Sequence, residues 1–173
     1  MPNYRRSWVP GGTFFFTVRV RAQLSLIDYI DNLRSALAET RLVRPFELQA
    51  MVVLPDHLHC IWRLPGADSD NAIRWRQMKA AFCRGVPALE SRNTSRHRRG
   101  ERGIWQRRFW ERVLRDENDR RAHLDYIHFN PVKHGYVMRV VDWPYSSFHR
   151  YVERGLLSAD WGGTREGGIK PVR

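Results

Sequence analysis

The sequence predicts an α+β protein in which a small antiparallel sheet packs against helices. Short runs rich in aromatic and β-branched residues alternate with amphipathic segments, in the order β-α-β-β-α-β followed by one more helix. There is no internal repeat and no run of about 18 apolar residues that would span a membrane. This order matches a ferredoxin-like split β-α-β sheet, with helices on one face and an added C-terminal helix.

The first half of the chain supplies three of the strands and one helix. Residues 12–20 follow a Pro-Gly-Gly turn and read GTFFFTVRV, which is typical of a strand. Residues 25–40 carry apolar side chains at helical spacing, and Ser25 is a suitable N-cap. Residues 45–54 and 58–64 are two more apolar runs, separated by a tight turn at the sequence PDH. They predict a strand pair joined by that turn.

The second half supplies the remaining elements. Residues 69–85 form an amphipathic helical pattern, and residues 91–103 are polar and arginine-rich, as in a loop. Residues 104–114 alternate basic and apolar side chains, which predicts the fourth strand. A helix is expected from about residue 117 to 130, because the segment begins with acidic residues and ends before Pro131.

The composition bounds the class of protein. A chain of 173 residues that is 42% hydrophobic and 12% aromatic is expected to form one globular domain over residues 1–173. Within it we expect a basic N-terminal arm (residues 1–11) and a C-terminal tail (from about 152 to 173). We expect a monomer, because the sequence has no strongly apolar extra helix that would have to be buried against a second subunit.

The cysteines and the N-terminus indicate a compartment. Cys60 and Cys83 fit neither a disulfide framework nor a zinc pattern, so both thiols are expected to lie in the core of a cytoplasmic protein. The N-terminus has basic residues but lacks the apolar segment of a signal peptide.

The charge balance indicates a polyanionic partner. Thirty Lys and Arg residues against 18 Asp and Glu give a net charge of +12, and only three of the thirty are lysines. Arginine donates paired hydrogen bonds to phosphate and stacks on bases, which favours a nucleic acid over a membrane surface. The alternative is a basic surface without a partner.

Two histidines at the start of the third strand are candidate metal ligands. His57 and His59 are two residues apart, so their side chains point to the same face of a strand, while Cys60 points to the other. Two imidazoles need a further ligand to hold a divalent cation. Taken alone, such a pair is more often structural than metal-binding.

The last helix offers partners for this pair. Tyr126 and Asn130 are four residues apart and share one helical face. An Asn carbonyl oxygen is an acceptable ligand for Mg²⁺ or Mn²⁺, and a tyrosine can act as a nucleophile on phosphate. Periodicity alone favours an ordinary core aromatic at Tyr126, and Asn130 before Pro131 is equally explained as a helix terminus.

Four segments together resemble a known family. They are YRRSWVPGGTFFFTV, PFELQAMVVLPDHLHCIWRLP, RGIWQRRFWE and DYIHFNPVKHGYV followed by DWPYSSFHRYV. In this order they resemble the REP-associated tyrosine transposases, which are bacterial relatives of the IS200/IS605 single-tyrosine transposases in the HUH endonuclease superfamily. The likeness spans the chain from Tyr4 to about Trp161.

The resemblance implies a chemistry for these residues. Tyr126 would attack the scissile phosphate of single-stranded DNA, leaving a 5′-phosphotyrosyl enzyme and a free 3′-OH. His57 and His59 would hold a divalent ion (Mg²⁺ or Mn²⁺), with Asn130 in the third position, where related transposases often have Gln or another polar residue. The expected substrate is hairpin DNA of the repeated extragenic palindrome (REP) type, in a nucleoid-associated bacterial protein with a catalytic C-terminal helix.

The basic segments are the expected DNA contacts. Between Arg92 and Arg115, nine arginines are interleaved with Trp105, Phe109 and Trp110, a mixture suited to phosphates and unpaired bases. On an alternating strand, Arg108 and Trp110 share one face, and Arg107, Trp105 and Phe109 share the other. One of these faces is expected to lie in the core, and the pattern does not show which. The N-terminal arm is a second basic patch, which the resemblance associates with a short single-stranded tag beside the hairpin. The predicted contacts are Tyr4, Arg5, Arg6, Arg96, Arg98, Arg99, Trp105, Arg107, Arg108 and Lys133.

Two other functions remain open from the residues. One is a DNA- or RNA-binding module on the same sheet, with structural histidines and no catalysis. The other is a zinc-dependent hydrolase, which lacks a convincing third ligand and a general base.

Overall fold

The fold, taken from a computed structural model that describes residues 7–21, 24–87 and 102–163, is α+β as predicted. Four strands form one antiparallel sheet in the order β2-β3-β1-β4, which is the ferredoxin-like order. The elements are β1 (Thr13–Arg19), α1 (Ile30–Val43), β2 (Glu47–Val53), β3 (His57–Arg63), α2 (Asn71–Arg84), β4 (Trp110–Val113), α4 (Glu117–Lys133), η1 (Val140–Asp142) and α5 (Phe148–Glu153).

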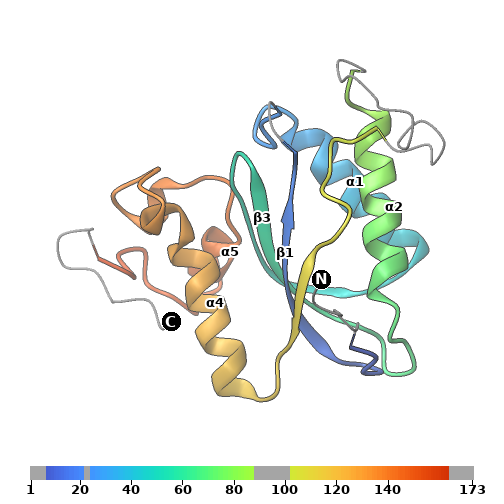
Figure 1. Cartoon of the computed structure of the whole chain (residues 1–173). Coiled ribbons are helices and arrows are strands. Elements are labelled where there is room, and N and C mark those ends of the chain that lie inside the picture. Colours follow the sequence, from blue (N-terminus) through green and yellow to red (C-terminus); the bar gives the residue numbers. More distant parts are fainter. Residues whose placement is uncertain (1–6, 22–23, 88–101, 164–173) are drawn as a thin grey trace, which may run out of the picture.

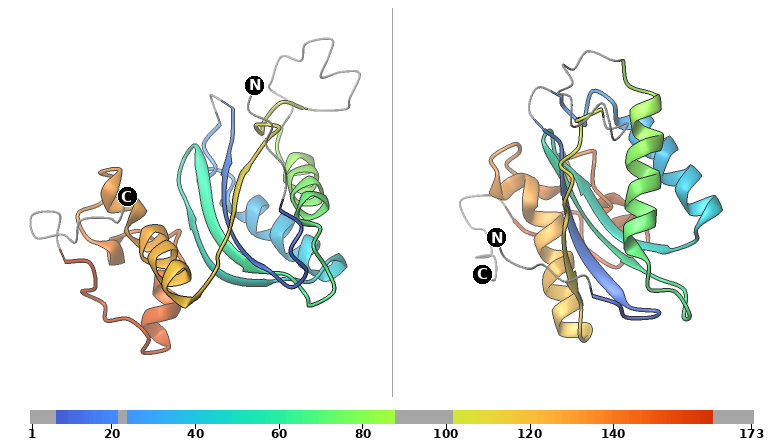
Figure 2. Two further views of the ribbon diagram at one scale, coloured as in Figure 1. Left: turned by 60° about the horizontal axis from the view of Figure 1, so that its bottom comes forward. Right: turned by 45° about the vertical axis from the view of Figure 1, so that its right-hand side comes forward.

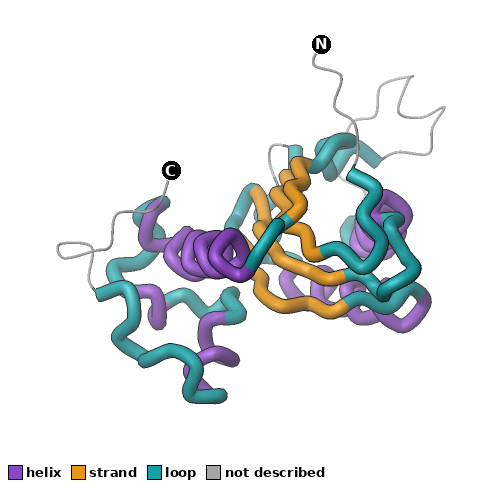
Figure 3. The backbone as a smooth tube through the Cα atoms, turned by 90° about the horizontal axis from the view of Figure 1, so that it is seen from below, coloured by secondary structure: helices purple, strands orange, loops and turns teal. Residues whose placement is uncertain are grey.

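Helices cover both faces of this sheet. The pair α1 and α2 lies on one face, and α4 with α5 lies on the other (Figure 1, Figure 2). The end-on view in Figure 3 separates the two groups of helices across the strands. The alternation of β1 serves both layers: Phe14 and Phe16 join the core beneath α1 and α2, whereas Phe15 joins the core beneath α4. The second face is therefore the one that α4 can equip with polar groups.

The first helix starts later than its sequence suggests. We predicted a start at Ser25, but α1 begins at Ile30, and its N-cap Tyr29 makes no side-chain cap. Leu26 is fully buried and its N–H donates to the carbonyl of Pro55 at 2.8 Å, which fixes this segment against the β2–β3 turn. The tertiary contact thus replaces the first helical turn.

The fourth strand is shorter than predicted. Of residues 104–114, only Trp110–Val113 form β4, and the preceding residues run beside β1 through a single bridge between Val20 and Trp105. The alternation of basic and apolar residues in this stretch reflects core anchors and exposed arginines. It does not require a continuous strand.

The end of α4 also differs from the prediction. The helix continues through Pro131 to Lys133, and the next turn is closed by bonds from Tyr136 N to Pro131 O and from Gly135 N to Val132 O. Gly135 has a φ of 75°, so these bonds form a glycine-dependent C-terminal cap. The glycine, and not the proline, ends the helix. This adds a turn after Asn130 and places it inside the helix.

Two smaller expectations change as well. Cys60 is buried as predicted, but Cys83 is only partly buried. Part of the predicted C-terminal tail is packed, because the ring centroid of Trp161 lies 6.0 Å from that of Phe148. Residues 164–173 lie outside the described residues. Within the described part of the chain, no helix is long and apolar enough to cross a membrane.

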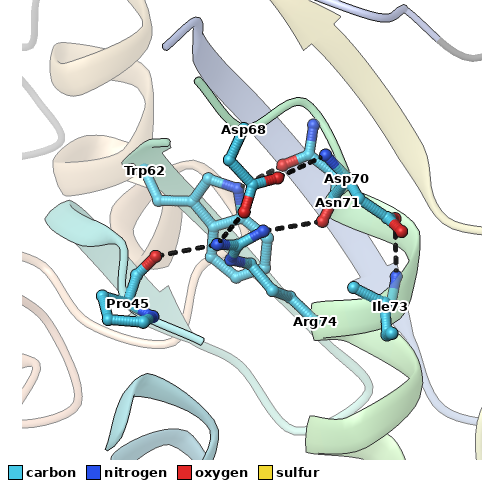
Figure 4. Close-up of polar contacts among 7 residues, drawn as sticks. All are labelled: Pro45, Trp62, Asp68, Asp70, Asn71, Ile73 and Arg74. Carbon is cyan, nitrogen blue, oxygen red and sulfur yellow. Dashed lines mark hydrogen bonds and ion pairs between the residues drawn. The ribbon is translucent and has the colours of Figure 1, made fainter. Parts of the chain in front are cut away.

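A buried arginine ties α2 to the loop before it (Figure 4). Arg74 is 1% exposed; its guanidinium donates to Asp68 Oδ2 at 2.7 Å and to the carbonyls of Pro45 and Asp70. Asp68 Oδ1 also accepts from the N–H of Asp70. The hydrogen bond from Arg74 keeps the pKa of Asp68 below its ordinary value. This carboxylate therefore both compensates a buried charge and shapes the start of α2.

Replacing Asp68 by Ala is expected to lower the free energy of unfolding by about 2–3 kcal/mol, because the buried guanidinium loses its counter-ion. Chemical denaturation measures this difference. The matched control is Asp31→Ala, which removes an exposed Asp–Arg pair and is expected to cost no more than about 0.5 kcal/mol. Equal losses in the two variants would contradict the assigned importance of the buried pair.

The C-terminal helices enclose a neutral histidine. His128 is fully buried; its Nε2 lies 3.1 Å from Ser147 Oγ, and its ring lies 5.0 Å from that of Tyr151. Burial first, and then the charges of Arg150 and His149, lower the pKa of His128 to about 4. Folding thus favours the uncharged imidazole.

The stability of the protein is expected to fall as the pH drops from about 6.5 to 4. A histidine with a lowered pKa in the folded state contributes its full stability above its unfolded pKa and loses it as the unfolded state takes up the proton. For His128 the loss at pH 4 is on the order of 3 kcal/mol. Unfolding titrations of His128→Gln should show a smaller loss over this range. An unchanged pH dependence in that variant would contradict the assignment.

Candidate functional site

The predicted histidine pair lies on the face of the sheet that α4 covers. His57 and His59 begin β3 and are 3% and 4% exposed. Their ring centroids are 4.8 Å apart and their planes are nearly perpendicular, at 81°. Cys60 points into the core beneath α1 and α2, as the strand alternation predicted. The two imidazoles therefore converge on the same small space.

Each imidazole is oriented by a hydrogen bond at Nδ1. Thr17 Oγ1 lies 2.8 Å from His59 Nδ1, and Asp56 Oδ1 lies 2.6 Å from His57 Nδ1. Since Nδ1 is engaged in both rings, Nε2 is the atom left to bind a ligand. Arg19 lies 4.0 Å from Asp56 and extends this chain of contacts.

The electrostatics of the site favour a neutral His59 and an ionised Asp56. Burial first, then the charges of His57, His134 and Arg19, lower the pKa of His59 to about 3. Burial raises the pKa of Asp56, but the hydrogen bond from His57 and nearby positive charges outweigh it, so the net shift is downward. A neutral imidazole with a free Nε2 is the form that binds metal ions.

Tyr126 projects from α4 toward the same pair. Its ring centroid lies 5.2 Å from that of His59, and both rings rest on Phe15, at 5.9 Å and 5.4 Å respectively. The ammonium of Lys133 lies 4.8 Å from the centroid of the tyrosine ring. Helical spacing puts Lys133 and Tyr126 on one side of α4, two turns apart. The structure thus joins the predicted tyrosine with the predicted histidines.

Asn130 lies one turn after Tyr126 and is fully buried. Neither its Oδ1 nor its Nδ2 has a hydrogen-bond partner among the described residues, and the same is true of His59 Nε2. A buried amide without partners is costly, and a bound ion would satisfy its oxygen. Imidazole nitrogen and amide oxygen are ligand types that a divalent cation accepts.

His134 was not predicted, yet it borders the site. Its ring centroid is 5.5 Å from that of His57, and the shape of the helix end brings it there. Its position eight residues after Tyr126 was a usable signal that the expected helix end at Pro131 concealed. In the described part of the chain, no three His, Cys, Asp or Glu side chains are grouped so as to hold a metal. A metal site here therefore needs Asn130 or ligand oxygens.

The predicted DNA contacts separate into three groups. Arg107, Arg108 and Lys133 are exposed. Trp105 is only 8% exposed and packs at 5.1 Å from Phe82, so it offers no open ring face for a base. The remaining six lie outside the described residues: Tyr4, Arg5, Arg6, Arg96, Arg98 and Arg99.

The register of β4 decides which aromatic of this segment is accessible. Phe109 and Trp105 face the core beneath α1 and α2, whereas Trp110 is 48% exposed and contacts Phe15 on the other face. Trp110 pairs with Thr17, the residue that orients His59. The sequence missed Trp110 because both faces of the alternating segment carry aromatic residues.

Comparison with known proteins identifies close relatives. No family model matches the chain. It is 47% identical over 94% of its length to the REP-associated tyrosine transposase of Escherichia coli K12, of which it covers 92%. A Haemophilus influenzae protein provisionally given the same name is 49% identical, with 98% of both chains covered.

A solved structure is similar over the whole chain. It is a REP-associated tyrosine transposase bound to a REP hairpin, and it shares 44% identity at a TM-score of 0.81, with 100% of both chains covered.

Proposed function

The chain belongs to the REP-associated tyrosine transposases, and on that premise we propose that it cleaves and rejoins single-stranded DNA at REP-type hairpins with Tyr126 as the nucleophile. Its ligand set for a divalent cation, Mg²⁺ or Mn²⁺, is His57, His59 and Asn130. The substrate class follows from the relative whose structure contains a REP hairpin.

The observation that carries this proposal is the approach of Tyr126 to the histidine pair. The tyrosine comes from α4 and His59 from β3, and their ring centroids are 5.2 Å apart. A tyrosine beside a phosphate held at two imidazoles is positioned for in-line attack.

The proposed metal ligands are prepared for binding by their partners. Thr17 and Asp56 engage the two Nδ1 atoms, and the lowered pKa of His59 keeps that ring neutral. The amide oxygen of Asn130 is buried without a partner among the described residues. A bound divalent ion would polarise the scissile phosphate and neutralise part of its charge.

The chain's own residues then perform the transfer. The phenol of Tyr126 gives up its proton and its oxygen bonds to phosphorus, while the bond from phosphorus to the 3′ oxygen breaks. The leaving oxygen takes up a proton and becomes a 3′-OH, and the DNA stays attached as a 5′-phosphotyrosine. Attack by a 3′-OH on this linkage reverses the step, so that rejoining needs no ATP.

Positive charge beside the tyrosine and on the segment before β4 suits a phosphate backbone. Lys133 is exposed beside the Tyr126 ring, and Arg107 and Arg108 are exposed on the segment before β4. Together with the net charge of +12, these groups favour DNA binding that weakens as salt rises.

The test is covalent capture of labelled DNA. We expect single-stranded DNA with a REP hairpin to form a protein adduct on a denaturing gel with Mn²⁺, and none with EDTA. Restoring Mn²⁺ after EDTA should restore the adduct. Tight hairpin binding without an adduct, across varied hairpins and both ions, would indicate a binding module instead.

A further inference from the structure

A row of paired residues crosses the site face of the sheet. Val52 on β2 pairs with His59 on β3, His59 pairs with Thr17 on β1, and Thr17 pairs with Trp110 on β4. Residues paired in this way present their side chains on one face. At about 4.8 Å per strand, the row spans roughly 15 Å, with the histidine in its interior.

An exposed aromatic ring stands at the β4 end of this row. Trp110 is 48% exposed and touches Phe15 edge to face, with the ring centroids 5.7 Å apart. Phe15 in turn contacts Tyr126. One edge of the indole is therefore anchored next to the tyrosine, and much of its surface is left to solvent.

A second exposed ring stands beyond the β2 end. Tyr136 is 44% exposed and lies 5.3 Å from Trp143, with the planes inclined at 34°. Trp143 is fixed to the end of β2 by a 3.0 Å hydrogen bond from its Nε1 to the carbonyl of Val53. His134 connects this group to the site, at 6.2 Å from Tyr136 and 5.5 Å from His57.

We propose that Trp110 and Tyr136 are stacking platforms for two unpaired bases of the DNA strand, one on each side of the phosphate at Tyr126. This rests on the proposed function, because it extends the same site to the strand that passes through it. A nucleophile that acts on a single strand needs that strand held on both sides of the attacked bond.

The chemistry of the two rings favours bases as their occupants. An aromatic platform binds any base through its π-face, while nearby cations bind the backbone. Arg112 shares the face of Trp110 on β4, where it also contacts Asp119, and Lys133 lies beside Tyr126. An apolar partner protein would instead have to cover these charged groups. The surface therefore suits a polyanion with exposed rings.

The platforms are tested by binding in a protein that cannot react. In a Tyr126→Phe background with EDTA, REP hairpins with unpaired 5′ and 3′ tails carry the fluorescent base 2-aminopurine at one tail position at a time. We expect strong quenching at a position in one tail that is lost in Trp110→Ala, and at a position in the other tail that is lost in Tyr136→Ala. Each alanine change should weaken binding of the tailed hairpin about tenfold.

Matched variants separate stacking from structural damage. Trp110→Phe and Tyr136→Phe keep a ring and should retain most of the quenching. Hairpins without tails should bind all variants to within about twofold, because no unpaired base is lost. Unchanged binding and quenching in both alanine variants would overturn the inference, and so would equal losses for tailed and tailless hairpins. Position-specific quenching, combined with no adduct from the wild-type protein and Mn²⁺, would support the platforms and contradict the proposed nuclease activity.

Discussion

Tyr126→Phe is expected to abolish the covalent DNA adduct while leaving hairpin affinity within about twofold, since the change removes one oxygen and keeps the ring. The substituted ring would still rest on Phe15 and beside Lys133, as that of Tyr126 does. Phenylalanine at position 126 has no hydroxyl that could attack the phosphate. Cleavage should therefore fall by at least about 10³-fold, to the background of the assay.

Parallel measurements of adduct formation and of binding by fluorescence anisotropy test this result. The control is Tyr29→Phe, the same chemical change on the other side of the sheet, where Tyr29 packs against Phe82. That variant should form the adduct at the wild-type rate. An adduct that persists in Tyr126→Phe would exclude this nucleophile, and Tyr136 would be the next tyrosine to replace.

The second large effect is expected at His59. His59→Ala removes an imidazole whose Nε2 has no partner among the described residues, and with it one of the proposed ligands. Metal-stimulated cleavage should fall by at least about 100-fold, and raising the Mn²⁺ concentration should recover little of it. The adduct yield as a function of Mn²⁺ concentration measures this.

A graded pair at Thr17 tests whether the orientation of His59 matters. Thr17→Val removes the hydroxyl that engages His59 Nδ1 and keeps the shape of the side chain, whereas Thr17→Ser keeps the hydroxyl. We expect Thr17→Val to need about 10-fold more Mn²⁺ for half-maximal cleavage and Thr17→Ser to resemble the wild type. If Thr17→Val and Thr17→Ser need the same Mn²⁺ concentration, Thr17 does not position His59 for metal binding.

The sequence predicts those parts of the candidate site in which the residues are close together along the chain. His57 and His59 share a face because they are two apart on a strand, and Tyr126 and Asn130 because they are four apart on a helix. Neither the strand spacing nor the helix spacing shows that the histidines and the tyrosine lie close together. The family resemblance implied that contact. The structure brings Tyr126 to His59, with α4 across the sheet from α1 and α2.

Other parts of the site depend on contacts distant in sequence. The partnership of Thr17 with His59 is set by the register of β1 on β3, which no local pattern encodes. His134 was missed because Pro131 resembled a helix terminus, whereas the cap at Gly135 carries the helix further. The alternating segment gives each face both aromatic and basic residues, so the sequence does not show that Trp110 is the exposed aromatic and Trp105 the buried one.

The pairing of β1 with β4 limits the order in which the parts of the protein can assemble. Phe14 near the start of the chain pairs with Val113, and the tyrosine follows on the helix after that strand. Sheets closed by such distant pairings form slowly, because a long loop must be ordered before the contact forms. During synthesis the histidine strand leaves the ribosome well before the tyrosine helix. A nascent chain therefore contains the proposed histidine ligands well before it contains Tyr126, and a fragment released by interrupted synthesis lacks the proposed nucleophile.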